Sequence, residues 1–309
     1  MAFEGVVHGD IGKPCRLRFA LDLQIHVECP AAKTPQELHH KKRDNVRLRA
    51  KPVVDEAWYD RPMTITVLQW NTWYQENVHH IAGFLAEHPA DILTLQELTI
   101  GDRLQDVPNS PDFLAASLGY HAHYKDMPYE TADGTTVTLA STILSKHPIA
   151  TTRAEWFSQP APSDAIADHY RAYVEATIDL PDGSQITVGT AAASYTDSFT
   201  NSVAKDAETE RLINTMGAHQ QRYIFGGDLG ATPPSHTYED FCQMLEPRGP
   251  NLVQPTWTTK PFGRNQYDIH ELAWRLDYIF STPDVKQIDA AVLETPYSSH
   301  LPIAATFEV

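Results

Sequence analysis

The sequence is poor in cysteine and has no long hydrophobic run. Among its 309 residues there are only three cysteines, odd in number and widely spaced: Cys15, Cys29 and Cys242. This argues against a disulfide framework or a cysteine-rich zinc site, and it favours a reducing compartment. No apolar stretch approaches the roughly 20 residues of a membrane-spanning helix, and the first residues lack the basic start and apolar stretch of a secretory signal. These absences predict a cytoplasmic protein with no membrane span.

Positive charge is also scarce. Lys and Arg total 24 against 40 Asp and Glu, which gives a formal net charge of −16. So acidic a chain repels polyphosphates at long range, and a nucleic acid is therefore disfavoured as a partner. The exception is residues 33–51, where Lys and Arg outnumber the acidic residues. That segment is either a solvated basic loop or an arm that binds nucleic acid or phosphate.

Two regions of different texture predict the domain organisation. Residues 1–62 form an N-terminal extension with one strand of period-two patterning, Arg16–Val27, followed by the basic segment. The extension cannot build its own core, so it is expected either to pack on the main body or to be mobile beside it. Residues 63–309 form the main domain. Nothing in the sequence indicates an oligomeric state.

From residue 63 onward, short apolar strands are interrupted irregularly by helices. Helices are expected at Val78–Glu87 and Ser202–Met216, the second with a buried stripe of Ala204, Ala207, Leu212 and Ile213. Strands are expected at Ile65–Leu68, Ile92–Leu95, Val137–Leu144, Tyr173–Ile178, Ile186–Gly189, Arg222–Phe225, Leu276–Phe280 and Ala304–Val309. Because strands outnumber helices, the pattern predicts a layered α/β fold with the helices outside the sheets.

Polar side chains lie at the ends of several of these strands. They are Asn71, Glu97, Asp228, Asp277 and His300. Taken singly, each has an ordinary structural role as a cap, a turn residue or an ion-pair partner. In layered α/β folds, however, side chains at strand ends converge at one rim, where binding sites form. A carboxylate just past a buried strand also needs a partner or a cation.

The segments around these residues resemble the endonuclease/exonuclease/phosphatase superfamily, which has the DNase I-like fold. The matching segments, in order, are Gln69-Trp70-Asn71, Leu95-Gln96-Glu97, Ser141-Thr142-Ile143-Leu144-Ser145, Gly226-Gly227-Asp228-Leu229, Arg275-Leu276-Asp277-Tyr278-Ile279 and Ser299-His300-Leu301-Pro302-Ile303. Their order and spacing match over about residues 63–309. The resemblance implies an α/β/β/α sandwich of four layers, in which helices flank two mainly antiparallel sheets. It also implies Mg²⁺-dependent hydrolysis of a phosphoester, typically a phosphodiester, by an activated water.

The resemblance also implies a role for each residue. Glu97 would be the main Mg²⁺ ligand, helped by Asn71, which would also orient the phosphate. Asp228 would hold or deprotonate the attacking water. His300 would contact the phosphate or act as acid and base, its ring oriented by Asp277.

Three positions depart from the family pattern. The family has His where this chain has Ala192, Asn where it has Gly230, and Asp where it has Ser299. Each change replaces a functional polar group by a small, inert one. Loss of one electrostatic stabiliser typically costs about 10²–10³ in rate, so hydrolysis is expected to be crippled. Mg²⁺ binding is expected to be weakened or absent.

Three interpretations follow. The first is a member of the family whose phosphoester hydrolysis is disabled. The second is a repurposed enzyme that uses the His300–Asp277 pair as acid and base on a non-phosphate organic substrate. The third is a non-catalytic binding protein. Aromatic residues near the motifs would suit a small organic ligand in a pocket, although such residues also pack cores. They include Trp70, Tyr195, Trp257 and Tyr297.

Overall fold

The structure is a computed structural model of the chain. It describes the backbone of three short strands within residues 1–28 and, from residue 63, residues 63–101, 106–131, 134–159, 170–196, 199, 201–264 and 267–309. The side chains of 264–268 are not among those described. Residues 1–55 and 56–309 form two separate units, and each is considered by itself.

The first unit contains a small antiparallel sheet in the order β1-β2-β3. Its strands are β1 (Glu4–His8), β2 (Pro14–Arg18) and β3 (His26–Glu28). The expectation of one strand over Arg16–Val27 is wrong, because Leu17 pairs with Val27 across two antiparallel strands. Period-two patterning continues through both arms of a hairpin and does not reveal where the chain reverses. The basic segment 33–51 lies outside the described residues.

Two six-stranded sheets form the body of the second unit. The first sheet has the order β16-β17-β4-β5-β7-β6. Its strands are β4 (Thr64–Asn71), β5 (Ile92–Ile100), β6 (His121–Glu130), β7 (Thr136–Ser145), β16 (Lys286–Val292) and β17 (Ile303–Glu308). Only β4 and β5 run parallel within it, and the other neighbours are antiparallel.

The second sheet has the order β12-β15-β11-β10-β9-β8. Its strands are β8 (Ile149–Ser158), β9 (Arg171–Asp179), β10 (Gln185–Ala191), β11 (Tyr223–Asp228), β12 (Glu246–Arg248) and β15 (Asp277–Ser281). β10 and β11 are its parallel pair. A separate hairpin joins β13 (Phe262–Arg264) to β14 (Tyr267–Ile269).

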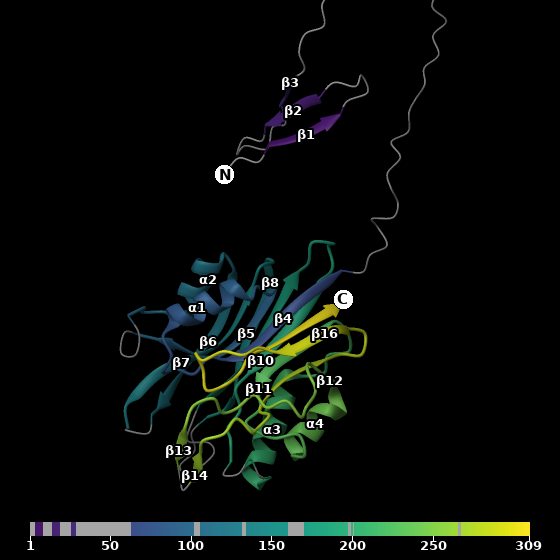
Figure 1. The fold of residues 1–309 in the computed structure, drawn as a ribbon. Coiled ribbons are helices and arrows are strands. Elements are labelled where there is room, and N and C mark those ends of the chain that lie inside the picture. The colour runs from purple at the N-terminus through teal and green to yellow at the C-terminus, as the bar shows by residue number, and fades with distance from the viewer. Residues whose placement is uncertain are drawn as a thin grey trace, which may run out of the picture. The chain divides into compact units, whose positions relative to one another are not determined.

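The sheets pack face to face, and helices cover their outer faces (Figure 1). Between the sheets lies an apolar core that includes Val67, Ile92, Val174 and Ile224. Helices α1 (Val78–Glu87) and α2 (Ser110–Leu118) cover the first sheet. Helices α3 (Val203–Met216) and α4 (His236–Met244) cover the second. The four-layer α/β/β/α sandwich predicted from the sequence is therefore confirmed.

The helices show where apolar patterning is informative. Helix α1 has the expected bounds, since a clear apolar face made of Val78, Ile81, Phe84 and Leu85 is buried. Helix α3 lies where expected, but its buried face consists of Lys205, Glu208, Thr209, Leu212 and Met216, so the predicted alanine stripe is wrong. Lys205 and Glu208 are buried as an ion pair. Apolar patterning in the sequence cannot reveal a buried face that contains such a pair. Within the described residues, no helix combines the length and apolarity needed to cross a bilayer.

Candidate active site

The five polar residues predicted at strand ends meet at one rim of the sandwich. Asn71 ends β4, Glu97 lies within β5, Asp228 ends β11, Asp277 begins β15 and His300 precedes β17. The Asn71 Nδ2 atom donates to Glu97 Oε1 and to Asp228 Oδ2, both at 3.0 Å. Since Asn71 belongs to the first sheet and Asp228 to the second, this amide joins the two sheets at the rim.

Glu97 reaches the rim through an irregularity in its strand. The pairing of β5 with β7 shifts register between Leu95 and Leu98, and Glu97 has a left-handed backbone with φ of 61°. A bulge of this kind redirects one side chain without ending the strand. Non-glycine residues in this conformation concentrate at functional sites.

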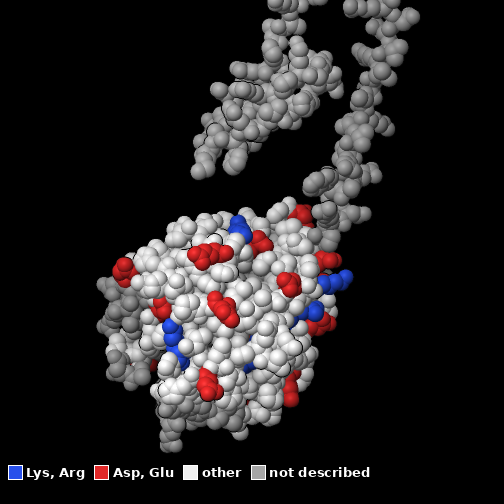
Figure 2. Space-filling view, viewed as in Figure 1, with Lys and Arg blue, Asp and Glu red and all other residues white. Residues whose placement is uncertain are grey.

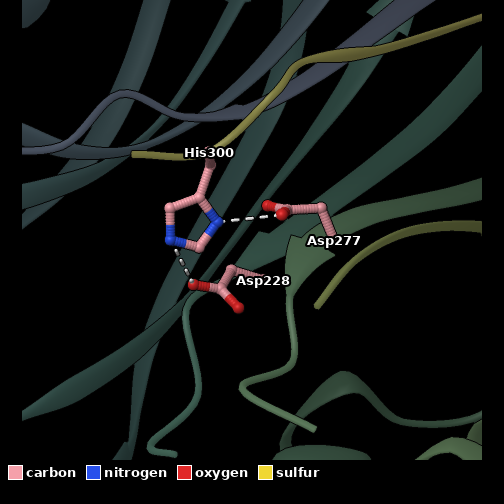
Figure 3. A group of neighbouring side chains, drawn as sticks. All are labelled: Asp228, Asp277 and His300. Atoms are coloured by element: carbon pink, nitrogen blue, oxygen red, sulfur yellow. Dashed lines mark hydrogen bonds and ion pairs between the residues drawn. The ribbon is translucent and has the colours of Figure 1, made fainter. Parts of the chain in front are cut away.

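The His300 ring lies between two carboxylates (Figure 3). Its Nδ1 atom is 2.9 Å from Asp277 Oδ2, and its Nε2 atom is 3.9 Å from Asp228 Oδ2. Asp228 and Asp277 are direct cross-strand partners of β11 and β15. Like charges in that arrangement destabilise a sheet, and a protonated imidazole between them compensates the repulsion.

Burial and charge shift the pKa values of this cluster. Burial alone lowers the pKa of His300, but the Asp277 and Asp228 carboxylates outweigh it and raise that pKa to about 9. For Asp228, burial raises the pKa to about 6, although the His300 imidazolium opposes the rise. Between these values Asp228 is an anion and His300 a cation, which is the charge state of a general base beside a general acid.

Stability is expected to fall as pH rises through this window. The folded-state pKa of His300, about 9, lies above the ordinary unfolded value of about 6.5. The stabilisation is therefore fully present below about pH 6.5 and is lost through about pH 9, a loss of roughly 2–4 kcal/mol. Urea unfolding at pH 6.5 and 9.5 measures it. Asp277→Asn should show a smaller decline, and a wild-type stability that rises over this range would contradict the assignment.

Neighbouring groups fix the backbone around His300. The Ser298 Oγ atom donates to the Asn71 carbonyl at 2.7 Å and accepts from the His300 N–H at 3.0 Å. The Trp70 indole donates to the His300 carbonyl at 3.0 Å. The Trp70 ring packs against Phe84 of α1. It faces the helix layer because side chains alternate along β4 and Asn71 faces the rim.

A cavity of about 300 Å³ opens beside the cluster, lined in part by Glu97, Asp228 and His300. Of the four aromatic residues predicted to line a pocket, Tyr195 and Trp257 do so. Trp70 and Tyr297 are not among the lining residues. Trp70 faces α1, and Tyr297 stacks on His80 of the same helix with ring centroids 4.9 Å apart. These two residues were predicted because they are close in sequence to site residues. Closeness in sequence does not show whether a side chain faces the cavity or the helix layer.

The three replaced family positions also lie around the rim. Ser299 and Gly230 line the cavity. Ala192 pairs with Asp228 across a parallel bridge, an arrangement that puts both side chains on the same face. A Cβ atom at Gly230 would lie 2.6 Å from the Ser194 carbonyl oxygen and 3.0 Å from the Tyr195 nitrogen. The backbone of Ser194 and Tyr195 therefore fills the space that a side chain at position 230 would need.

Arg171 is a cavity residue that the sequence analysis missed. It lines the cavity, is only 9% exposed, and its Nε atom is buried with no hydrogen-bond partner in the described part of the chain. Burial of a guanidinium is costly, and the nearby Glu208 carboxylate, whose pKa Arg171 lowers, offsets part of that cost. Arg171 therefore places a positive charge in the cavity lining, which suits an anionic ligand. The signal in the sequence was a charged residue at the first position of an apolar strand.

A buried ion pair supports the loops behind the cavity. The Lys205 ammonium is 3.2 Å from Glu208 Oε2 and donates to the carbonyls of Ser194 and Leu229. Although burial raises the pKa of Glu208, Lys205 and Arg171 lower it below its ordinary value. Because Lys205 bonds to both loops, it holds Ser194 against the turn that contains Gly230.

The acid–histidine cluster by itself is poorly suited to a metal ion. Asp228, Asp277 and His300 offer ligand atoms within 4.8 Å of one another. The 2.9 Å bond between His300 Nδ1 and Asp277 leaves Nε2 as the only ring nitrogen that could ligate a metal. The carboxylates that raise the pKa of His300 favour its protonated form, which cannot ligate.

Glu97 is the better candidate for Mg²⁺. Magnesium is usually held by one or two carboxylates, with waters and substrate phosphate completing the shell. Glu97 lines the cavity, and its two oxygens accept from Asn71 and from the Tyr74 N–H, leaving further lone pairs. At the same rim Ser299 supplies only a neutral hydroxyl. The donor set fits one weak Mg²⁺ site centred on Glu97.

A family model shows which protein family the chain belongs to. The model of the endonuclease/exonuclease/phosphatase family matches residues 68–300, about three quarters of the chain. The chain belongs to this family. No curated protein matches the sequence. Members of the endonuclease/exonuclease/phosphatase family typically depend on a divalent metal.

Solved structures with the same fold come from distant members. An endonuclease/exonuclease/phosphatase from Beutenbergia cavernae has 17% identity and a TM-score of 0.63, covering 81% of this chain and 72% of its own. A mannosyl-6-phosphatase from Bacteroides thetaiotaomicron has 14% identity and a TM-score of 0.56, with 78% and 98% covered. The human Nocturnin catalytic domain with bound sulfate has 17% identity and a TM-score of 0.55, with 80% and 93% covered. At these identities the likeness concerns the fold alone.

Proposed function

We propose that the protein is a hydrolase of small phosphoesters whose catalytic rate is reduced by the replacements at Ala192, Gly230 and Ser299. The observation that carries this proposal is the His300 ring between two carboxylates, beside a cavity that Arg171 also lines. A guanidinium in the lining of a cavity suits a phosphate. Family membership and the names of similar proteins, a phosphatase among them, support the same class.

The acid and base divide the reaction between them. Asp228, ionised above about pH 6, accepts a proton from water as the water oxygen bonds to phosphorus. The ester P–O bond breaks, and the leaving oxygen takes a proton from His300, which is cationic below about pH 9. The proton that restores both groups then passes from Asp228 to His300, and across the 3.9 Å between His300 Nε2 and Asp228 Oδ2 this transfer needs one intervening water. Asn71 orients Asp228 through its 3.0 Å hydrogen bond.

Arg171 and Glu97 bind rather than transfer protons. Arg171 holds the phosphate oxygens in this proposal, in place of the polar groups lost at the replaced positions. Bound Mg²⁺, held weakly by Glu97, would neutralise negative charge on the phosphate. Because one acidic ligand is missing at Ser299, we expect Mg²⁺ binding to be weak.

The surface supports a small substrate rather than a nucleic acid. On the face in Figure 2, acidic side chains are spread widely and basic ones appear singly or in small groups. The net charge of −16 also disfavours a polyphosphate. Cys242 is exposed and unpaired, which suits the reducing, cytoplasmic compartment expected from the sequence.

Arg171 provides the test of this proposal. Arg171→Gln is expected to raise KM for p-nitrophenyl phosphate and bis(p-nitrophenyl) phosphate about 10- to 100-fold, since hydrogen bonds to charged groups contribute that much. Lys286→Gln removes an exposed charge on β16 outside the cavity lining and should leave KM unchanged. Steady-state kinetics with and without Mg²⁺ measure both. Equal KM values for the wild type and Arg171→Gln would overturn the phosphate-binding role.

A second candidate function is acid–base catalysis on a non-phosphate organic substrate. The observation that favours it is the closure of Ser194 and Tyr195 over Gly230, which removes the space for a family asparagine. The His300–Asp277 pair would then act as acid and base on a different anion beside Arg171. Ligand binding without any turnover would instead favour the third possibility, a non-catalytic binding protein.

A further inference from the structure

The cavity is lined by polar groups and by aromatic rings. The polar groups include Arg171 and the acid–base pair. Four of the aromatic lining residues, here called the aromatic wall, are Tyr195, Phe199, Trp257 and Phe262. Their rings contact one another in sequence: Tyr195 with Phe262 at 6.0 Å, Phe262 with Trp257 at 5.1 Å, and Trp257 with Phe199 at 5.4 Å between centroids.

The aromatic wall reaches the catalytic cluster itself. The Trp257 ring centroid lies 6.2 Å from that of His300. Trp257 and Phe199 are buried, whereas Tyr195 remains 38% exposed although it is large and partly apolar. Ser299 and Gly230 line the cavity together with the wall. The aromatic wall and the acid–base pair therefore line the same cavity.

The volume limits what can enter. About 300 Å³ is at the lower end of small-molecule sites, so a single ring with its charged group can be accommodated. Aromatic rings prefer other aromatic rings in stacked or edge-to-face geometry, beyond what apolar area alone provides. A saturated ring of the same size gains only the free energy of burying its apolar surface.

We infer that the ligand is a small phosphoester of a planar aromatic group, with its ring against the aromatic wall and its phosphate at Arg171 and His300. This inference rests on the proposed function, because it takes the anion at Arg171 to be a phosphate. It assigns the aromatic wall to substrate selection, which the hydrolytic chemistry does not require.

Phosphonates test the inference without turnover, because their C–P bond resists hydrolysis. Phenylphosphonate is expected to bind the wild type about threefold to tenfold more tightly than cyclohexylphosphonate in isothermal titration calorimetry. In Phe262→Leu the ratio of the two dissociation constants should fall towards one. Inorganic phosphate should bind this variant as tightly as it binds the wild type. Phe113→Leu, which alters a partly buried ring packed beside α1, is the matched control and should keep the preference.

The outcomes separate the two proposals. Equal binding of both phosphonates by the wild type, or a preference that survives Phe262→Leu, would overturn the role of the aromatic wall alone. Failure of all three anions to bind would overturn the phosphate site and the inference together. Displacement of phenylphosphonate by micromolar single-stranded oligonucleotide would also overturn the inference, because it would show a polymer in the same cavity.

Discussion

His300→Gln is expected to lower phosphoester hydrolysis by about 10²–10⁴-fold. This is the range that a positioned general acid or base contributes. Glutamine keeps a hydrogen-bonding side chain near Asp277 but cannot hold a proton at neutral pH. The measurement is kcat/KM for p-nitrophenyl phosphate, with circular dichroism to verify folding.

A second histidine–carboxylate pair supplies the control for that variant. His219 Nε2 lies 3.0 Å from Glu175 Oε2, and the ring stacks on Tyr223. His219 is not among the cavity-lining residues. His219→Gln should therefore retain wild-type activity. Retained activity in His300→Gln would remove the acid–base pair from the mechanism.

The combination Ala192→His with Ser299→Asp is expected to raise Mg²⁺-dependent hydrolysis of bis(p-nitrophenyl) phosphate by about 10²-fold or more. Each change restores a group whose loss typically costs about 10²–10³ in rate. The histidine would lie on the same face as Asp228, its bridge partner, and the aspartate would add a second carboxylate near Glu97. Ala193→His with Ser299→Asp places the ring one residue away and is expected to give no comparable gain.

Adding Gly230→Asn to that combination is expected to bring no further gain and to lower stability by roughly 1–3 kcal/mol, as overpacking does. The left-handed backbone at φ of 56° is tolerable for asparagine. The obstacle is the Ser194 carbonyl 2.6 Å from the new Cβ, which Lys205 holds in place. A large further gain in rate without loss of stability would contradict the closure of this loop.

The sequence was sufficient to predict the layers and the convergence of five polar residues. Asn71, Glu97, Asp228, Asp277 and His300 stood out because a polar group beside a buried strand needs a partner. Their convergence follows from the topology, since β4 and β11 end at the same rim and the bulge in β5 turns Glu97 towards it. The clear apolar face of α1 likewise gave its bounds.

Other features depend on tertiary structure and left no pattern to read. Helix α2 is short, and its segment Ser110–Leu118 is rich in small residues. Helix α4 buries only Thr237, Tyr238 and Phe241. The ion pair on the buried face of α3 looks like ordinary surface charge in the sequence. Neither the bulge that turns Glu97 nor the loop that closes on Gly230 has a local signature, because both are set by neighbouring strands.

The pH profile of kcat/KM tests the central claim most directly, that a buried aspartate and an imidazolium share the proton transfers. The shifted values predict a bell with limbs near pH 6 for Asp228 and near pH 9 for His300, as apparent values of a coupled pair. Asp277→Asn should move the alkaline limb to lower pH, because the carboxylate raises the pKa of His300. A flat profile, or limbs near the ordinary values of about 4 and 6.5, would contradict the account.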